Sequence, residues 1–110
     1  MDKAAALAIA GRYCERVRSR MKVRKVVLYG SQARGSAGED SDIDIAVVVH
    51  GLDEDFLDLA AELYRMRGEI DIRIEPILLD ETHDRSGFVA EVVRTGEVLY
   101  DADDGPQRAG

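Results

Sequence analysis

The sequence has few of the residues that characterise disulfide-stabilised or aromatic-rich proteins. Its 110 residues include one cysteine, Cys14, and no tryptophan, and only 5% of them are aromatic. A single cysteine cannot form an intrachain disulfide, which indicates a reducing, cytoplasmic environment. With so few aromatic rings, the core is expected to consist mainly of Val, Ile, Leu and Ala, with Cys14 buried on the apolar face of a first helix.

Long apolar runs and an excess of positive charge are also absent. No run reaches the roughly 20 apolar residues that span a bilayer, so no membrane segment is predicted. The N-terminal apolar patch is interrupted at Arg12 and Glu15, which indicates a helix and not a secretion signal. Fifteen Lys and Arg against 22 Asp and Glu give a net charge of −7. Direct nucleic-acid binding is therefore not expected. A loose basic cluster at residues 16–25 is the alternative, because it could form a local basic patch.

The hydrophobic pattern predicts one small α/β (α+β) domain over residues 1–100, with a mixed sheet flanked by helices, and a disordered acidic tail over 101–110. The expected elements are a helix over 3–20, strands over 26–29 and 42–49, a helix capped by Asp53 and running to about Arg67, a strand from Ile70 to about Leu79, a short helix around 88–93 and a last strand over 98–100. The buried stripe of the second long helix is expected to contain Phe56, Leu59, Ala60, Leu63 and Met66 or Tyr64. Pro76 favours an edge or a bulge in the third strand.

This order predicts where polar residues gather. Only a Gly- and Ser-rich segment joins the first two strands, which favours an antiparallel pair. A helix joins the second strand to the third, which favours a parallel pair. The end of the first strand, at Gly30 and Ser31, should then lie beside the beginnings of the next two, at Asp42, Asp44 and Asp71.

Asp42 and Asp44 are the central candidates for chemistry. Two residues apart on a strand, they share a face with a spacing of about 6.6–7 Å. Asp71, on the neighbouring strand, can add a third carboxylate. Mutual repulsion among three anions is relieved by Mg²⁺, which prefers oxygen ligands and substrate phosphates. Two such ions about 3.5–4 Å apart stabilise an in-line phosphoryl displacement.

The segment between the first two strands supplies groups for the phosphates. Gly30 permits a sharp turn and a close approach to a ligand. Ser31 can begin a short helix over 32–34, whose free N–H groups would face phosphate oxygens. Arg34 either contacts a phosphate or faces solvent.

Residues 40–44 also fit two simpler interpretations, a solvated acidic loop and the start of an EF-hand. Acidic residues after a Gly/Ser loop are usually solvated, and residues 40–44 imitate the start of an EF-hand. The EF-hand interpretation fails because Ile45 occupies the turn position and Gly51 the twelfth. The metal site is favoured because the two aspartates lead directly into the apolar run 45–49, where two anions are costly without a purpose.

The run GSQARGSAGEDSDID, Gly30 to Asp44, resembles the G-S, ten residues, D-x-D signature of the polymerase-beta-type nucleotidyltransferase superfamily. Together with the strand DIDIAVVV, it is similar to the minimal nucleotidyltransferase (MNT) branch over about residues 3–100. The resemblance implies that Gly30 and Ser31 hold the β- and γ-phosphates and that Asp42 and Asp44 ligate two Mg²⁺ ions. Asp71 matches the third carboxylate, which would help to deprotonate the acceptor; Glu75, on the same face, is the competitor.

The resemblance further implies transfer of AMP from ATP to a hydroxyl. Polymerases carry additional domains that grip a primer, for which this chain has no room. Stand-alone MNT domains resemble the antitoxins of HEPN–MNT pairs, so a tyrosine of a HEPN-type toxin is the expected acceptor, within a stable complex. The alternatives are a catalytically idle module that neutralises its partner by binding alone, and transfer to a small molecule such as an aminoglycoside.

Overall fold

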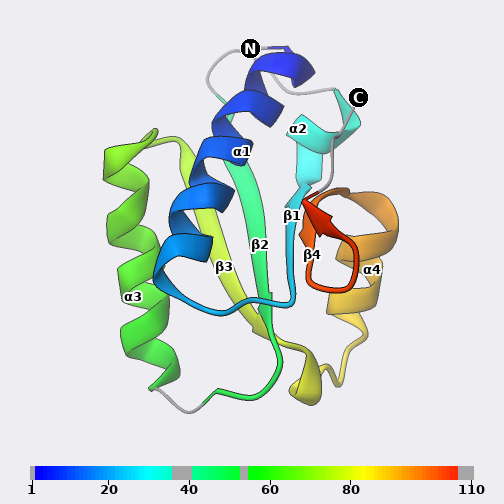
Figure 1. Cartoon of the computed structure of the whole chain (residues 1–110). Coiled ribbons are helices and arrows are strands. Elements are labelled where there is room, and N and C mark those ends of the chain that lie inside the picture. The colour runs from blue at the N-terminus through cyan, green and yellow to red at the C-terminus, as the bar shows by residue number, and fades with distance from the viewer. Residues whose placement is uncertain (1, 36–40, 53–54, 107–110) are drawn as a thin grey trace.

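The structure confirms the predicted class, a small mixed sheet flanked by helices (Figure 1). The computed structural model describes residues 2–35, 41–52 and 55–106. In chain order the elements are α1 (Lys3–Arg20), β1 (Lys25–Tyr29), α2 (Gly30–Arg34), β2 (Ile43–Val49), α3 (Phe56–Met66), a 3-10 turn (Arg67–Glu69), β3 (Ile74–Asp80), a second 3-10 turn (Glu81–His83), α4 (Phe88–Thr95), β4 (Glu97–Asp101) and β5 (Gly105–Pro106).

The strands lie in the order β3-β2-β1-β4-β5. As predicted, β1 and β2 are antiparallel and β2 and β3 are parallel. β1 pairs with β4 on its other side, also in the antiparallel direction. β3 therefore forms one edge of the sheet, which is where a strand containing Pro76 is tolerated.

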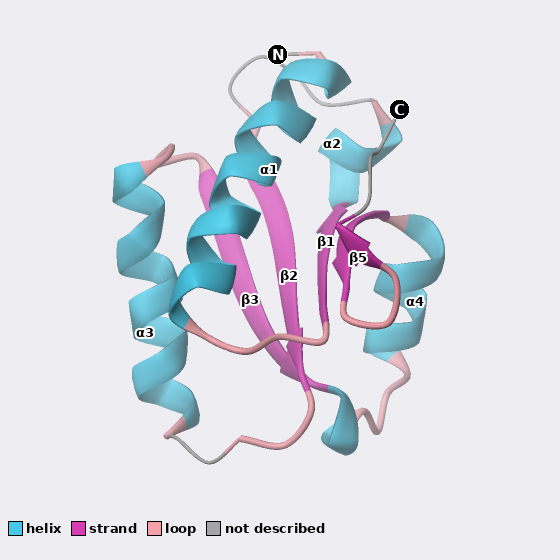
Figure 2. Ribbon diagram, in the orientation of Figure 1, coloured by secondary structure: helices cyan, strands magenta, loops and turns pink. Residues whose placement is uncertain are grey.

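Helices cover the two faces of the sheet unequally (Figure 2). α1 and α3 pack on one face, and α4 packs on the other. Side chains alternate along each strand, so Ile43, Ile45 and Val47 face α1 and α3 while Ala46 faces α4. The core is mainly aliphatic, as expected, and Cys14 is buried within it on α1.

Helix capping follows simple side-chain chemistry. The Asp2 carboxylate accepts a hydrogen bond from the Ala5 amide at 2.8 Å, and this bond starts α1. At α3, Asp55 caps the helix by accepting from the Asp58 amide at 3.1 Å. The predicted cap, Asp53, lies outside the described residues.

Three predictions about these elements were wrong. Phe56 of α3 is 44% exposed, so the buried stripe of this helix is formed by Leu59, Leu63 and, of the two alternatives, Met66 and not Tyr64. The third strand begins at Ile74 and not at Ile70. The tail predicted to be disordered is structured in its first part, because Tyr100 and Asp101 of β4 pair with β5.

The part of the chain that the structure describes has no helix long and apolar enough to cross a membrane.

Candidate functional site

The predicted polar residues lie where the strand order predicted them, at the end of the sheet where β1 ends and β2 and β3 begin. This end is called the site edge below. Asp44, the second residue of β2, is paired with Tyr29 of β1 on one side and Glu75 of β3 on the other. By strand alternation, Asp44 and Glu75 point to the face that also carries Ala46 and α4. Asp42 precedes β2 by one residue. The end of β1 leads directly into α2.

Asp44 carries the least compensated charge of this group. Burial raises its pKa above the usual range, and the neighbouring carboxylates of Asp42 and Glu75 raise it further. The positive charge of Arg34, the last residue of α2, opposes the shift. The exposed Arg34 side chain is therefore close enough to the site edge for its charge to act on it. Arg34 and the Glu75 partner Arg67 offset two of the three carboxylates, so the site keeps an excess negative charge.

Gly30 brings the backbone of α2 directly against Asp44. Its φ is +73°, a conformation that residues with a side chain rarely adopt. A Cβ at this position would lie 2.6 Å from Asp44 Oδ2. Ser31 follows as the second residue of α2 and is half-buried. The G-S dipeptide and the D-x-D motif, twelve residues apart at their first positions, are thus in contact in the fold.

Gln32 has a structural role that was not predicted from the sequence. It is 1% exposed, and its Nε2 donates to the Ser41 carbonyl at 3.3 Å. This bond ties α2 to the residue just before Asp42 and so joins the two ends of the intervening loop. Residues 36–40 of that loop lie outside the described residues. No sequence pattern distinguished Gln32 from an exposed glutamine.

Asp71 lies in a different environment from Asp44. It belongs to the turn before β3, where Oδ1 accepts from the Arg73 amide at 2.9 Å and Arg73 Nη2 donates to Oδ2 at 2.7 Å. These hydrogen bonds lower the pKa of Asp71 to about 2, and the charge of Arg12 lowers it too. Arg12 is a residue of α1, which covers the opposite face of the sheet from α4. Asp71 is thus ion-paired within its own turn, and Glu75, not Asp71, lies opposite Asp44 in the register of β2 and β3.

Glu75 is the carboxylate of β3 that meets Asp44. It is opposite Asp44 in the parallel register, and its charge contributes to the raised pKa of Asp44. Its Oε1 lies 3.4 Å from Arg67 Nη1, and its side chain is 45% exposed. In the sequence analysis, Glu75 was the alternative to Asp71 as the third carboxylate.

The donor chemistry of the site edge fits a hard divalent cation. Carboxylate oxygens are the ligands that Mg²⁺ prefers, and a cation would relieve the repulsion that raises the pKa of Asp44. Within residues 2–35, 41–52 and 55–106, however, no three acidic, histidine or cysteine side chains form a ready-made metal cage. Such an open donor set suits an ion that completes its coordination with water and substrate phosphates.

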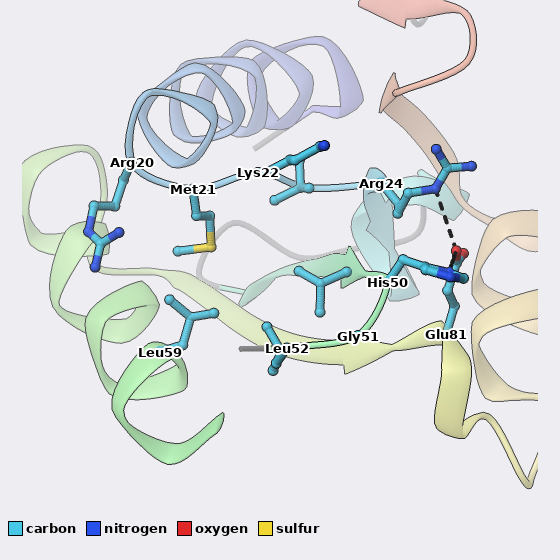
Figure 3. Close-up of a pocket in the computed structure, with 11 residues that line it drawn as sticks. Arg20, Met21, Lys22, Arg24, His50, Gly51, Leu52, Leu59 and Glu81 are labelled. Atoms are coloured by element: carbon cyan, nitrogen blue, oxygen red, sulfur yellow. Dashed lines mark hydrogen bonds and ion pairs between the residues drawn. The ribbon is translucent and has the colours of Figure 1, made fainter. Parts of the chain in front are cut away.

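A separate pocket of about 770 Å³ lies at the other end of the sheet (Figure 3). It is formed where β2 ends and β1 begins, and its lining includes Val23, Val49, Leu59 and basic side chains. Two of those cations are already paired: Arg20 with Glu62 at 2.6 Å and Arg24 with Glu81 at 3.5 Å. The basic cluster seen in the sequence is thus largely neutralised within the protein. None of the predicted site residues lines this pocket.

Comparison with solved structures supports the same fold. A crystal structure of a protein from Sulfolobus solfataricus, provisionally described as a nucleotidyltransferase, matches 97% of this chain and 90% of its own, with a TM-score of 0.71 at 24% identity. A toxin–antitoxin structure with AMP-PNP matches 84% of this chain and 73% of its own, with a TM-score of 0.64 at 23% identity. An MntA–HepT toxin–antitoxin structure has a TM-score of 0.60 at 21% identity, over 87% of this chain and 73% of its own.

Sequence comparison identifies the family. A protein of Methanocaldococcus jannaschii, provisionally named a protein adenylyltransferase, is 36% identical over 83 residues, which cover 74% of this chain and 82% of that protein. The family model for polymerase beta nucleotidyltransferases matches residues 14–105, which contain every candidate residue discussed above. This chain therefore belongs to the polymerase beta nucleotidyltransferase family, and its reaction is nucleotidyl transfer.

Proposed function

We propose that this chain transfers AMP from ATP to a hydroxyl group of a partner protein in a Mg²⁺-dependent reaction. The observation that carries the proposal is the convergence of Asp42, Asp44 and Glu75 on one face of the sheet, against the backbone of Gly30. An unbalanced group of carboxylates at the start of a buried strand is costly unless a cation and a phosphorylated substrate use it.

The third carboxylate of this proposal is Glu75. The sequence favoured Asp71, but both oxygens of Asp71 are engaged by Arg73 and its charge is already balanced. Glu75 has one long ion pair and faces Asp44. Asp71 instead stabilises the turn that leads into β3.

The chain's own groups have distinct tasks in this reaction. Asp42, Asp44 and Glu75 would hold Mg²⁺, which supplies neutralisation of the phosphate charge. Gly30 and Ser31 would bind the β- and γ-phosphates through backbone N–H groups and the serine hydroxyl. Arg34, whose charge acts on the site edge, would contact the triphosphate. Catalysis then comes mainly from positioning and electrostatic stabilisation.

In the transfer step, ATP and the acceptor hydroxyl are the two reactants. The acceptor oxygen forms a bond to the α-phosphorus, and the bond from that phosphorus to its bridging oxygen breaks. Pyrophosphate leaves with the electron pair of that bond. The acceptor proton passes to the carboxylate of Glu75, a residue of the edge strand β3.

The proposed acceptor is a tyrosine of a HEPN-type toxin, which would make this chain an antitoxin. Three observations support a protein acceptor: the name of the M. jannaschii relative, the toxin–antitoxin assemblies that share the fold, and a net charge of −7 that suits a basic partner. An antitoxin that acts by binding alone would share the last two features. The experiment below separates the two mechanisms.

The test is transfer of label from [α-³²P]ATP with Mg²⁺ to the protein encoded by the adjacent gene. We expect the partner to be labelled and peptide mass spectrometry to find AMP on a tyrosine. The Asp42→Asn/Asp44→Asn double variant should not transfer label, whereas Asp71→Asn should. If the double variant still neutralises the partner and the unaltered chain transfers no label, the protein is a binding antitoxin and the proposed activity is wrong.

A further inference from the structure

Arg67 lies at the junction between α3 and the turn before β3, and several contacts hold its side chain. Nη1 donates to the carbonyls of Ile72 at 2.5 Å and Ile74 at 3.3 Å. The guanidinium lies over the Tyr64 ring, 3.8 Å from its centroid, and also donates to the Tyr64 hydroxyl. The side chain is 18% exposed. A planar group with these contacts is fixed by the backbone of the turn and by α3.

The anionic partner of this fixed cation is Glu75. Their Nη1 and Oε1 atoms are 3.4 Å apart, and this ion pair uses one carboxylate oxygen and leaves Oε2 outside it. A glutamate that is 45% exposed would otherwise sample many rotamers, and ordering it costs free energy. Repulsion from Asp44 would also turn it away from the site.

We infer that Arg67 is a positioning residue that holds Glu75 beside Asp44 with one oxygen anchored and the other free for a cation or a proton. The inference rests on the proposed role of Glu75 and goes beyond it, because it assigns a function to a residue outside the signature motif. Arg67 does not contact the substrate. It acts through the orientation of the carboxylate, as groups that support metal ligands do in other sites.

Lysine at this position separates orientation from charge. Its ammonium retains the positive charge but lacks the planar fork and the stacking surface of arginine. If only the charge of Arg67 matters, Arg67→Lys will behave like the unaltered protein. If orientation matters, Arg67→Lys will lose most of the effect.

The test is a double-mutant cycle on Mn²⁺ affinity, measured by electron paramagnetic resonance with an ATP analogue whose α,β bridge cannot be hydrolysed. Arg67→Lys is expected to weaken Mn²⁺ binding by about 10-fold. In a Glu75→Gln background the same substitution should change the affinity by less than about twofold, because the carboxylate that it positions is absent. The melting temperature of the metal-free variants is measured alongside.

Two outcomes would overturn the inference. An equal loss of affinity in both backgrounds would show that Arg67 acts through the fold, and no loss in either would show that it does not position Glu75. Unchanged Mn²⁺ affinity in Glu75→Gln alone would instead refute the third-carboxylate assignment of the proposed function. Arg65→Gln, an exposed arginine of the same helix, is the control and should bind Mn²⁺ normally.

A second variant serves if Arg67→Lys does not fold. Tyr64→Leu removes the ring beneath the guanidinium at a position that is 49% exposed, so the fold should tolerate it. It is expected to weaken Mn²⁺ binding in the same direction, and only when Glu75 is present. A loss that persists in Glu75→Gln would contradict the inference.

Discussion

Asp44 and Asp71 were predicted to serve one site, and the structure gives them opposite environments. Around Asp44, burial and two neighbouring carboxylates raise the pKa. Around Asp71, hydrogen bonds from Arg73 lower it to about 2. The first carboxylate is destabilised as an anion by its surroundings, and the second is stabilised by them. The difference is the reason for proposing Asp44, and not Asp71, as a metal ligand: the surroundings leave the charge of Asp44 uncompensated and balance that of Asp71.

The contrast also separates stability from function. Asp71 connects the turn to β3, and Arg73 already neutralises its charge. Asp44 lowers the stability of the folded chain wherever it is ionised, which is the arrangement expected where binding a substrate is the purpose. Substitutions at the two positions should therefore change different measurements.

The largest expected effect is that of Asp44→Asn. Removing this charge should lower AMP transfer by about a hundredfold or more, because metal neutralisation is worth several kcal/mol. The thermal stabilisation by ATP with Mg²⁺ should also disappear. The metal-free melting temperature should rise near neutral pH, since a carboxylate whose pKa is raised in the folded state opposes folding once it is ionised. A lower metal-free melting temperature would contradict this account of Asp44.

Glu75→Gln and Asp71→Asn sharpen the comparison directly. Glu75→Gln should reduce transfer by about 10- to 100-fold with little change in stability. Asp71→Asn should retain transfer and lose about 1–2 kcal/mol of unfolding free energy, because hydrogen bonds to a charged group are lost. Transfer rates and urea denaturation of the same two samples provide the measurements. The reverse pattern would restore Asp71 as the third carboxylate.

Gly30→Ala and Gly35→Ala form a matched pair, because each glycine has a φ of +73°. Both should lose about 1–2 kcal/mol from backbone strain. Only at Gly30 would the new Cβ meet Asp44 Oδ2, at 2.6 Å, whereas nothing lies within 4 Å at Gly35. Gly30→Ala should therefore also displace the Asp44 carboxylate and weaken Mn²⁺–ATP binding, as calorimetry can measure. Equal binding by the two variants would mean that the contact has no functional role.

The smallest effect concerns acid stability. Asp71 has a folded pKa of about 2 against an ordinary 3.8, so its contribution is present above pH 3.8 and is lost as the pH falls towards 2. Unfolding by urea at a series of pH values should show that the unaltered protein loses more stability across this window than Asp71→Asn does. Parallel curves would indicate that Arg73 does not stabilise the Asp71 anion.

Much of the fold was predictable because its signals are local and strong. The apolar run 45–49 predicted a buried strand, Pro76 predicted an edge or a bulge, and connection lengths predicted the pairing directions. The pairing directions alone placed Gly30, Asp42 and Asp44 at the same end of the sheet.

The position of Asp71 in a turn was not predictable, for a physical reason. Residues 70–74 alternate as a strand does, yet the chain turns there and leaves Ile72 73% exposed. Hydrogen bonds from the Asp71 carboxylate to the backbone and side chain of Arg73 stabilise the turn, so a local interaction outweighs the period of two. The only sequence signal for this turn was an aspartate two residues before an arginine. The same spacing occurs between two strand residues on one face, so it does not identify a turn.

The buried thiol of α1 gives this chain a practical advantage. Cys14 is 3% exposed, and burial raises its pKa to about 11, so it will react slowly with thiol reagents. Because the chain has no other cysteine, one introduced at an exposed position would be the sole fast-reacting label. Ile72→Cys would place such a label on the turn before β3, three residues before Glu75 in sequence. A fluorophore or spin label at that position could report nucleotide and partner binding in solution without any substitution in the catalytic motif.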